Sequence, residues 1–128
     1  MPALLALLLA AQAVPVGTAQ RPLSVRHVME HADALDGREI VVSGWVEECL
    51  GLSCGLWASR AESRRRLPRY FLSIGSSAWF DAFAMRNTPR RVILRARFSA
   101  HCVTDPRTDV IAACTDRPRS LDPIAIVR

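Results

Sequence analysis

Arginine and aromatic side chains gather between positions 57 and 71, and these residue types can hold a ligand by charge and by stacking. Five of the ten residues from 60 to 69 are arginine, and aromatic residues flank this stretch on both sides. Guanidinium groups beside aromatic rings suit stacked bases or anionic sugars. The candidate ligand-binding residues are Trp57, Arg60, Arg64, Arg65, Arg66, Arg69 and Phe71.

Whether these rings can reach a ligand depends on strand register, because successive side chains of a strand point to opposite faces. If Leu72 and Ile74 point inward, Phe71 points outward and Trp57 can join it. The opposite register buries Phe71. The competing interpretation of 60–69 is a solvated loop between two strands, with the neighbouring aromatic rings in the core.

A second pattern, His27-Val28-Met29-Glu30-His31, matches the H-x-x-E-H spacing of inverted zinc peptidases, whose histidines ligate zinc and whose glutamate activates water. A peptidase also needs a third metal ligand and far more scaffold than one short helix supplies. Both histidines and Glu30 lie opposite the apolar stripe of the expected helix, so we favour an exposed helix face. The chain has no nucleophile elbow and no phosphate-binding glycine loop. We therefore predict no enzymatic activity, no metal and no cofactor.

Arg95 and Arg97 share one side of an alternating segment whose other side is apolar. One interpretation is a basic stripe continuous with 90–91. We favour cross-strand pairing with Glu39 or Glu47, because opposite charges on neighbouring strands stabilise a sheet.

The N-terminus has the pattern of a secretory signal peptide. The first twenty residues carry no charged side chain, and 3–11 is an unbroken run of alanine and leucine. Small residues create possible cleavage sites after Ala13 and after Ala19. The run is shorter than the roughly 18 to 20 apolar residues that a membrane span needs. We predict a signal peptide at 1–19, a periplasmic or secreted protein and no membrane span.

Export determines how the four cysteines are interpreted, because an even number of cysteines in a small exported domain usually forms disulfides. Cys49 and Cys54 form one close pair, and Cys102 and Cys114 form a second. Each pair flanks a stretch typical of a loop between two strands, so we predict the disulfides Cys49–Cys54 and Cys102–Cys114. A zinc site is the alternative, although these spacings depart from the tight C-x2-C knuckle.

Composition limits the chain to one basic globular domain. Half of the 128 residues are apolar, 23% are charged, and 17 arginines with 12 acidic residues give a formal net charge of +5. Such an apolar fraction excludes a wholly disordered chain, and the length fits a single domain. We place that domain at 20–128.

The hydrophobic pattern predicts two helices and five strands. Ser24 is the expected N-cap of the first helix, β-branched residues mark the first strand, and Gly44 lies where that strand would bend strongly. We predict helices at 24–35 and 78–86, strands at 39–49, 55–59, 70–74, 90–100 and 122–128, and a polar loop at 60–69.

This order of elements, together with the segments 35–46 and 91–98, resembles the OB-fold, a five-stranded Greek-key barrel. The resemblance covers about 35–127, and with its cysteines and the 114–117 stretch the chain is similar to small exported bacterial OB-type proteins of unassigned function. It implies a mainly β barrel with an N-terminal helix and a helix between strands three and four. It also implies a binding face on strands two and three. An open α+β sheet with both helices on one face is the alternative.

Two functional hypotheses follow. In the first, the chain is an exported, non-catalytic OB-type binding module for an anionic ligand, an envelope polymer or an acidic protein partner. Export disfavours nucleic acid, while the positive charge favours anions. In the second, it is a structural or stress-related envelope protein that makes only protein–protein contacts. The sequence leaves the ligand and the oligomeric state open.

Overall fold

The computed structural model describes residues 14–47, 49, 54–66, 68–75, 77–101 and 119–127. In these ranges no helix is both long enough and apolar enough to cross a membrane. Most of the predicted signal peptide and the predicted disulfide Cys102–Cys114 lie outside the described residues.

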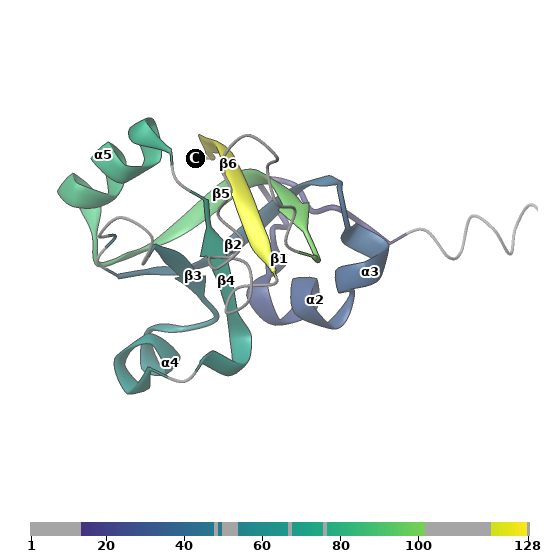
Figure 1. Cartoon of the computed structure of the whole chain (residues 1–128), viewed down its shortest axis with the longest axis horizontal. Coiled ribbons are helices and arrows are strands. Elements are labelled where there is room, and N and C mark those ends of the chain that lie inside the picture. Colours follow the sequence, from purple (N-terminus) through teal and green to yellow (C-terminus); the bar gives the residue numbers. More distant parts are fainter. Residues whose placement is uncertain are drawn as a thin grey trace, which may run out of the picture.

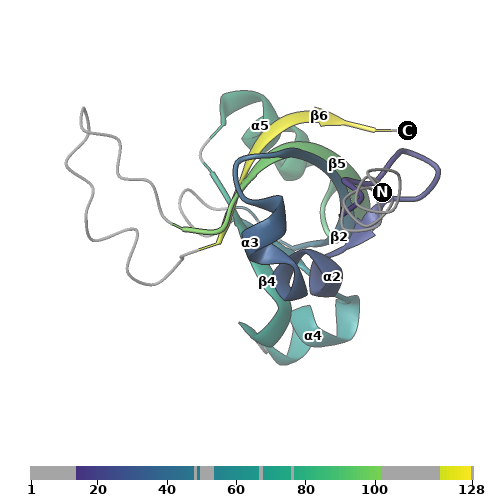
Figure 2. The ribbon, with the colours of Figure 1, turned by 90° about the vertical axis from the view of Figure 1, so that its right-hand side faces the viewer.

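The fold is mainly β and is built around a closed five-stranded barrel (Figures 1 and 2). Around the barrel the strands follow the order β2, β3, β4, β6 and β5, and β5 closes the ring by pairing with β2. The β4–β6 pair is parallel and the other four barrel pairs are antiparallel. A two-residue strand β1 pairs in parallel with β2. The strands are β1 Leu23–Ser24, β2 Glu39–Val46, β3 Gly55–Trp57, β4 Phe71–Ile74, β5 Arg90–Ser99 and β6 Ser120–Ile126.

The barrel closes at β2, which pairs with β3 on one side and with β5 on the other. The inward residues Ile40, Val42 and Val46 of β2 are fully buried. Gly44 lies between them, and a Cβ atom there would stand only 2.7 Å from the Trp57 carbonyl oxygen. Because Gly44 has no side chain, β3 can approach β2 closely at this point. This close approach fits the strong bend predicted for the strand at Gly44.

The N-terminal helical region closes one end of the barrel, and it consists of two short helices, α2 Val25–Glu30 and α3 Ala32–Leu35, instead of the single helix predicted. The predicted cap is confirmed, because the Ser24 hydroxyl accepts a hydrogen bond from the His27 N–H at 3.0 Å. The backbone leaves helical geometry at His31, which separates the two helices. The apolar stripe still faces the core.

Helix α5, Ala78–Asn87, lies at the opposite end of the barrel between β4 and β5 in sequence, as predicted (Figures 1 and 2). Phe80 and Ala84 are its fully buried residues. The aromatic contacts of α5 join Phe80 to Trp79 and to Phe83. The i,i+4 spacing of Trp79 and Phe83 would let their rings stack in a helix, but within this described helix each of the two rings contacts Phe80 instead.

The segment predicted to be a polar loop at 60–69 is largely helical, which corrects the sequence-based assignment. Helix α4 spans Arg60–Arg65 and is followed by the 3₁₀ turn η2, Pro68–Tyr70. The Ser59 hydroxyl accepts a hydrogen bond from the Glu62 N–H at 3.2 Å, which caps the start of the helix. The basic residues of the last turn interact favourably with the negative end of the helix dipole. The Ser59-x-x-Glu62 spacing is a helix-start signal.

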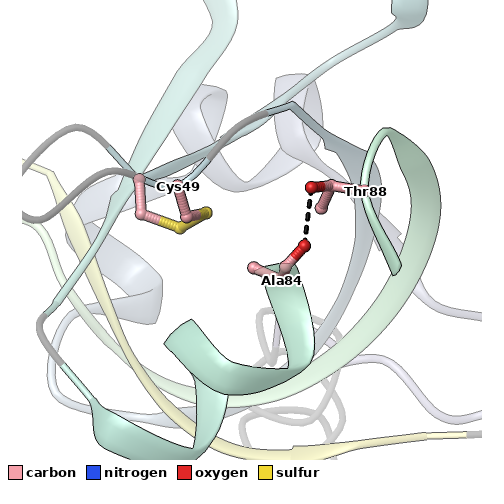
Figure 3. The surroundings of a disulfide bond; sticks show 4 residues. Cys49, Ala84 and Thr88 are labelled. Atoms are coloured by element: carbon pink, nitrogen blue, oxygen red, sulfur yellow. Dashed lines mark hydrogen bonds between the residues drawn. A yellow bond between two sulfur atoms is a disulfide. The ribbon is translucent and has the colours of Figure 1, made fainter. Parts of the chain in front are cut away.

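The disulfide predicted between Cys49 and Cys54 is confirmed. Both residues are buried in the core cluster, and their Cα atoms are 4.2 Å apart. Figure 3 shows the disulfide beside the C-terminal turn of α5, where the Thr88 hydroxyl donates a hydrogen bond to the Ala84 carbonyl at 2.6 Å. The bridge therefore closes the connection between β2 and β3 on itself, near the helical end of the barrel.

Candidate functional site

Three aromatic residues on three neighbouring strands form one row across the outside of the barrel. Trp45 on β2 is the register partner of Trp57 on β3, and Trp57 is the register partner of Phe71 on β4. Their strand neighbours Leu56 and Leu72 are fully buried. Because strand side chains alternate between faces, the three rings lie on the outer face. We call Trp45, Trp57 and Phe71 the aromatic row.

Two rings of the aromatic row, Trp57 and Phe71, pack on each other, and all three members keep part of their surface in solvent. All three residues are half-buried. The ring centres of Trp57 and Phe71 are 4.7 Å apart and their planes meet at 56°. The Trp45 indole N–H donates a hydrogen bond to the Glu47 carboxylate at 2.7 Å, which orients that ring. The row thus offers a ligand partly exposed aromatic faces held in place by packing.

Two arginines flank Trp45. The guanidinium carbon of Arg60, at the start of α4, lies 5.7 Å from the Trp45 ring centre. On the β5 side of Trp45, its register partner is Arg91. The Arg91 Nη2 donates a hydrogen bond to the Ser43 hydroxyl at 3.3 Å. Both arginines are exposed. Positive charge therefore borders the aromatic row on two sides.

The structure brings together only part of the set predicted from the sequence. Trp57, Phe71 and Arg60 lie within or beside the aromatic row. Arg69 instead lies near Tyr70, with its guanidinium carbon 6.0 Å from that ring centre. The remaining three predicted residues, at the end of α4, are exposed and make no ion pair within the described part of the chain: Arg64, Arg65 and Arg66.

Two members of the site, Trp45 and Arg91, are not among the ligand-binding residues predicted from the sequence, where Arg91 is considered only as part of a basic stripe on the strand. Both can be found by extending strand alternation to β2 and β5, because residues at alternate positions, Val46 and Val92, are apolar and face inward. What the sequence does not contain is the pairing of β2 with both β3 and β5, which brings these side chains to one level of the barrel.

The H-x-x-E-H pattern forms no metal centre within the described residues. The Glu30 carboxylate accepts a hydrogen bond from Arg26 at 3.0 Å, and this bond raises the pKa of the Arg26 guanidinium. The rings of His27 and His31 stack with centres 4.1 Å apart. Both histidines are half-buried, which corrects the expectation that they face solvent.

Arg95 and Arg97 serve mainly as structural contacts. The Arg95 Nε lies 3.6 Å from a Glu39 carboxylate oxygen, which confirms the predicted cross-strand pairing with that residue. Arg97 instead donates to the Gly37 carbonyl at 2.8 Å. Glu47, the other acid considered, is the partner of Trp45.

No protein-family model matches the chain, and no curated protein or solved structure is significantly similar to it. The site is therefore interpreted from its own residues.

A cleft separates the end of α5 from the start of β5 and the end of β6. Its volume is about 580 Å³. Arg91 lines it as well as flanking Trp45, so the cleft adjoins the site. We call it the α5 cleft, and it is lined by Phe83, Asn87, Arg90, Arg91, Val92, Ile93, Ile126 and Val127.

Proposed function

We propose that this chain is an exported, non-catalytic binding module that holds an anionic, ring-containing ligand on the aromatic row. The observation that carries the proposal is the register of Trp45, Trp57 and Phe71 on three adjacent strands, with Arg60 over the first of them. Neighbouring strands are about 4.8 Å apart, so the row presents several ring faces within the span of a short oligomer.

The chemistry of the row favours sugars that carry negative charge. Partly exposed aromatic rings stack on flat ligand surfaces, and exposed arginines attract anions over several ångströms. The formal net charge of +5 adds a long-range attraction. An anionic envelope polymer made of sugars would use both the stacking on the aromatic rings and the attraction to the arginines. An acidic protein partner would be attracted by the arginines but would stack less on the rings.

We further propose that the barrel is of the OB type. In support, the strand order and the position of α5 between the third and fourth barrel strands follow the arrangement expected for that fold. The usual OB binding face lies on the second and third strands, which correspond to β3 and β4 and carry Trp57 and Phe71. The proposed site and the proposed fold type therefore agree.

Export is part of the proposal and rests on two features. The sequence of 1–19 has the pattern of a signal peptide, and the Cys49–Cys54 disulfide fits an oxidising compartment. An exported module meets envelope polymers and extracellular proteins, which is why nucleic acid is not the ligand we propose.

One observation favours the alternative of a structural or stress-related envelope protein. Arg64, Arg65 and Arg66 lie exposed at the end of α4, away from the aromatic contacts described above. Such a cluster suits a solubilising surface or a protein–protein contact as well as a polymer. The two hypotheses differ in what Trp57 contributes, since only the binding module needs its exposed ring face.

Calorimetric titration with oligogalacturonate, set against a neutral malto-oligosaccharide of equal length, tests the proposal. We expect binding of the acidic oligomer only, with affinity that falls as salt rises above about 0.1 M, where the Debye length is about 10 Å. Trp57→Ala should weaken binding by about 1 to 3 kcal/mol. Arg60→Gln should also weaken it.

Two control variants match these substitutions. Trp79→Ala removes an exposed tryptophan on α5, and Arg65→Gln removes an exposed arginine of α4 outside the row. Both should bind as the natural chain does. If the natural chain binds neither oligogalacturonate, heparin nor polyglutamate, the binding-module proposal is wrong and the structural alternative stands.

A further inference from the structure

We infer that the α5 cleft is a second binding site, for a small amphipathic carboxylate whose head group is held by Arg90. The site is distinct from the aromatic row: it lies between α5, β5 and β6, while the row lies on β2, β3 and β4. A polymer on the row and a small molecule in the cleft would therefore bind through different side chains, apart from Arg91.

The cleft has the size and lining of a small-molecule site. Its volume of about 580 Å³ falls within the range of roughly 300 to 1,000 Å³ typical of ligand pockets. Phe83 contributes an aromatic wall from α5, and Ile93 and Ile126 contribute aliphatic side chains from β5 and β6. All three are half-buried, so each has surface left to cover. This wall suits an alkyl chain or an apolar ring.

The two cationic residues at the cleft have neutral hydrogen-bond partners. The Arg90 Nη1 donates to the Asn87 side-chain oxygen at 3.4 Å, and the Arg91 Nη2 donates to the Ser43 hydroxyl at 3.3 Å. No acidic residue is among those that line the cleft. The Arg90 guanidinium thus stands at the apolar wall, beside the Phe83 ring, and no residue lining the cleft offers it a carboxylate, which is the group that it binds best.

Asn87 positions one of these groups. Its amide nitrogen donates to the Phe83 carbonyl at 2.7 Å, which holds the side-chain oxygen toward Arg90. The Arg90 guanidinium carbon lies 6.0 Å from the Phe83 ring centre. Positive charge therefore stands at one end of the apolar wall, and a ligand with a carboxylate at one end and an apolar body matches both.

Calorimetry on the oxidised full chain with octanoate and the neutral octanamide tests the inference. We expect saturable octanoate binding and affinity for octanamide at least about tenfold lower, because the amide lacks the charge that the guanidinium groups bind. Arg90→Gln should weaken octanoate binding by about tenfold or more. Arg95→Gln, on the same strand but outside the cleft, should leave it unchanged. Circular dichroism establishes that each variant is folded.

Amide chemical-shift mapping locates the bound octanoate whatever the variants do. We expect shifts at Phe83, Ile93 and Val127 and none at Trp57. Equal affinity for octanoate and octanamide, or unchanged octanoate binding by Arg90→Gln, would overturn the inference. Shifts confined to the aromatic row, or no saturation with octanoate up to about 10 mM, would overturn it as well. Arg60→Gln separates the two sites, because it should affect oligogalacturonate and not octanoate.

Discussion

The ring of Phe71 lies directly over Gly55, so that a methyl group on Gly55 would overlap two atoms of the ring. Gly55 on β3 is the register partner of Ser73, two residues along β4 from Phe71, which makes this a diagonal contact between the two strands. The same ring packs against Trp57. The missing side chain of Gly55 therefore determines where one end of the aromatic row lies.

Gly55→Ala should displace the Phe71 ring and destabilise the fold. Overpacking of this kind typically costs about 1 to 3 kcal/mol of the free energy of unfolding, which urea denaturation measures. Oligogalacturonate affinity should fall as well, because the Trp57–Phe71 packing changes.

Gly75→Ala is the matched control, since a Cβ atom there meets only the Leu121 carbonyl oxygen at 3.4 Å. It should change stability far less. Adding Phe71→Leu to Gly55→Ala should recover part of the lost stability, because the smaller side chain makes room for the methyl group. If Gly55→Ala costs no more than Gly75→Ala and Phe71→Leu recovers nothing, the Phe71 ring does not constrain Gly55.

Removing the Cys49–Cys54 disulfide by replacing both residues with alanine should lower the free energy of unfolding by about 2 kcal/mol. The bridge closes a loop with a sequence separation of 5, and a loop of that length restricts the unfolded chain by about this amount. Urea denaturation of the double variant measures the loss. A variant as stable as the natural chain would show that this bridge does not contribute to stability.

We expect signal peptide cleavage after Ala13, the first of the two candidate sites, so that Val14 becomes the first residue and the signal peptide is shorter than the 1–19 predicted from the sequence. The Val16 carbonyl accepts a hydrogen bond from the Val41 N–H at 2.9 Å, and the Val14 carbonyl accepts one from Arg38 at 3.0 Å. Cleavage after Ala19 would remove both contacts and part of the apolar packing on the core.

Intact mass of the exported protein checks the cleavage site. A shortened chain that begins at Gln20 provides the comparison, and it should be about 1 to 3 kcal/mol less stable because the buried Val41 N–H loses its partner. An exported protein beginning at Gln20 with undiminished stability would contradict the prediction.

The ion pair between Arg95 and Glu39 should contribute less than about 1 kcal/mol. Side-chain exposure is 47% for Arg95 and 50% for Glu39, and solvent screens such pairs. A double-mutant cycle with Arg95→Gln and Glu39→Gln measures the coupling, which should shrink further as salt is added. A coupling above 2 kcal/mol would show that the pair is more than a surface contact.

Much of the barrel can be predicted from local patterns. The alternation of arginine with apolar residues along β5 predicts which side chains face inward, and Ser24 and the turn at 36–37 mark the limits of the N-terminal helical region. The disulfide between Cys49 and Cys54 can be predicted from their short separation in the sequence, because two cysteines so close along the chain can meet whatever the rest of the fold.

The candidate site is harder to predict because it depends on pairing between distant strands. Trp45 lies beside Trp57 because β2 pairs with β3, and it lies beside Arg91 because β2 also pairs with β5. This register is a property of the closed barrel. The α4 helix was missed for a different reason: five arginines suggest a solvated loop, while the Ser59–Glu62 cap outweighs that composition.

The most direct test of the proposed site is the set of indole N–H signals of the three tryptophans, observed by NMR while oligogalacturonate is added. Single Trp→Phe variants assign the signals. The aromatic-row proposal predicts that the signals of Trp45 and Trp57 shift with one common affinity while that of Trp79 stays in place. A shift of the Trp79 signal alone, or bound ligand with all three signals unmoved, would contradict it.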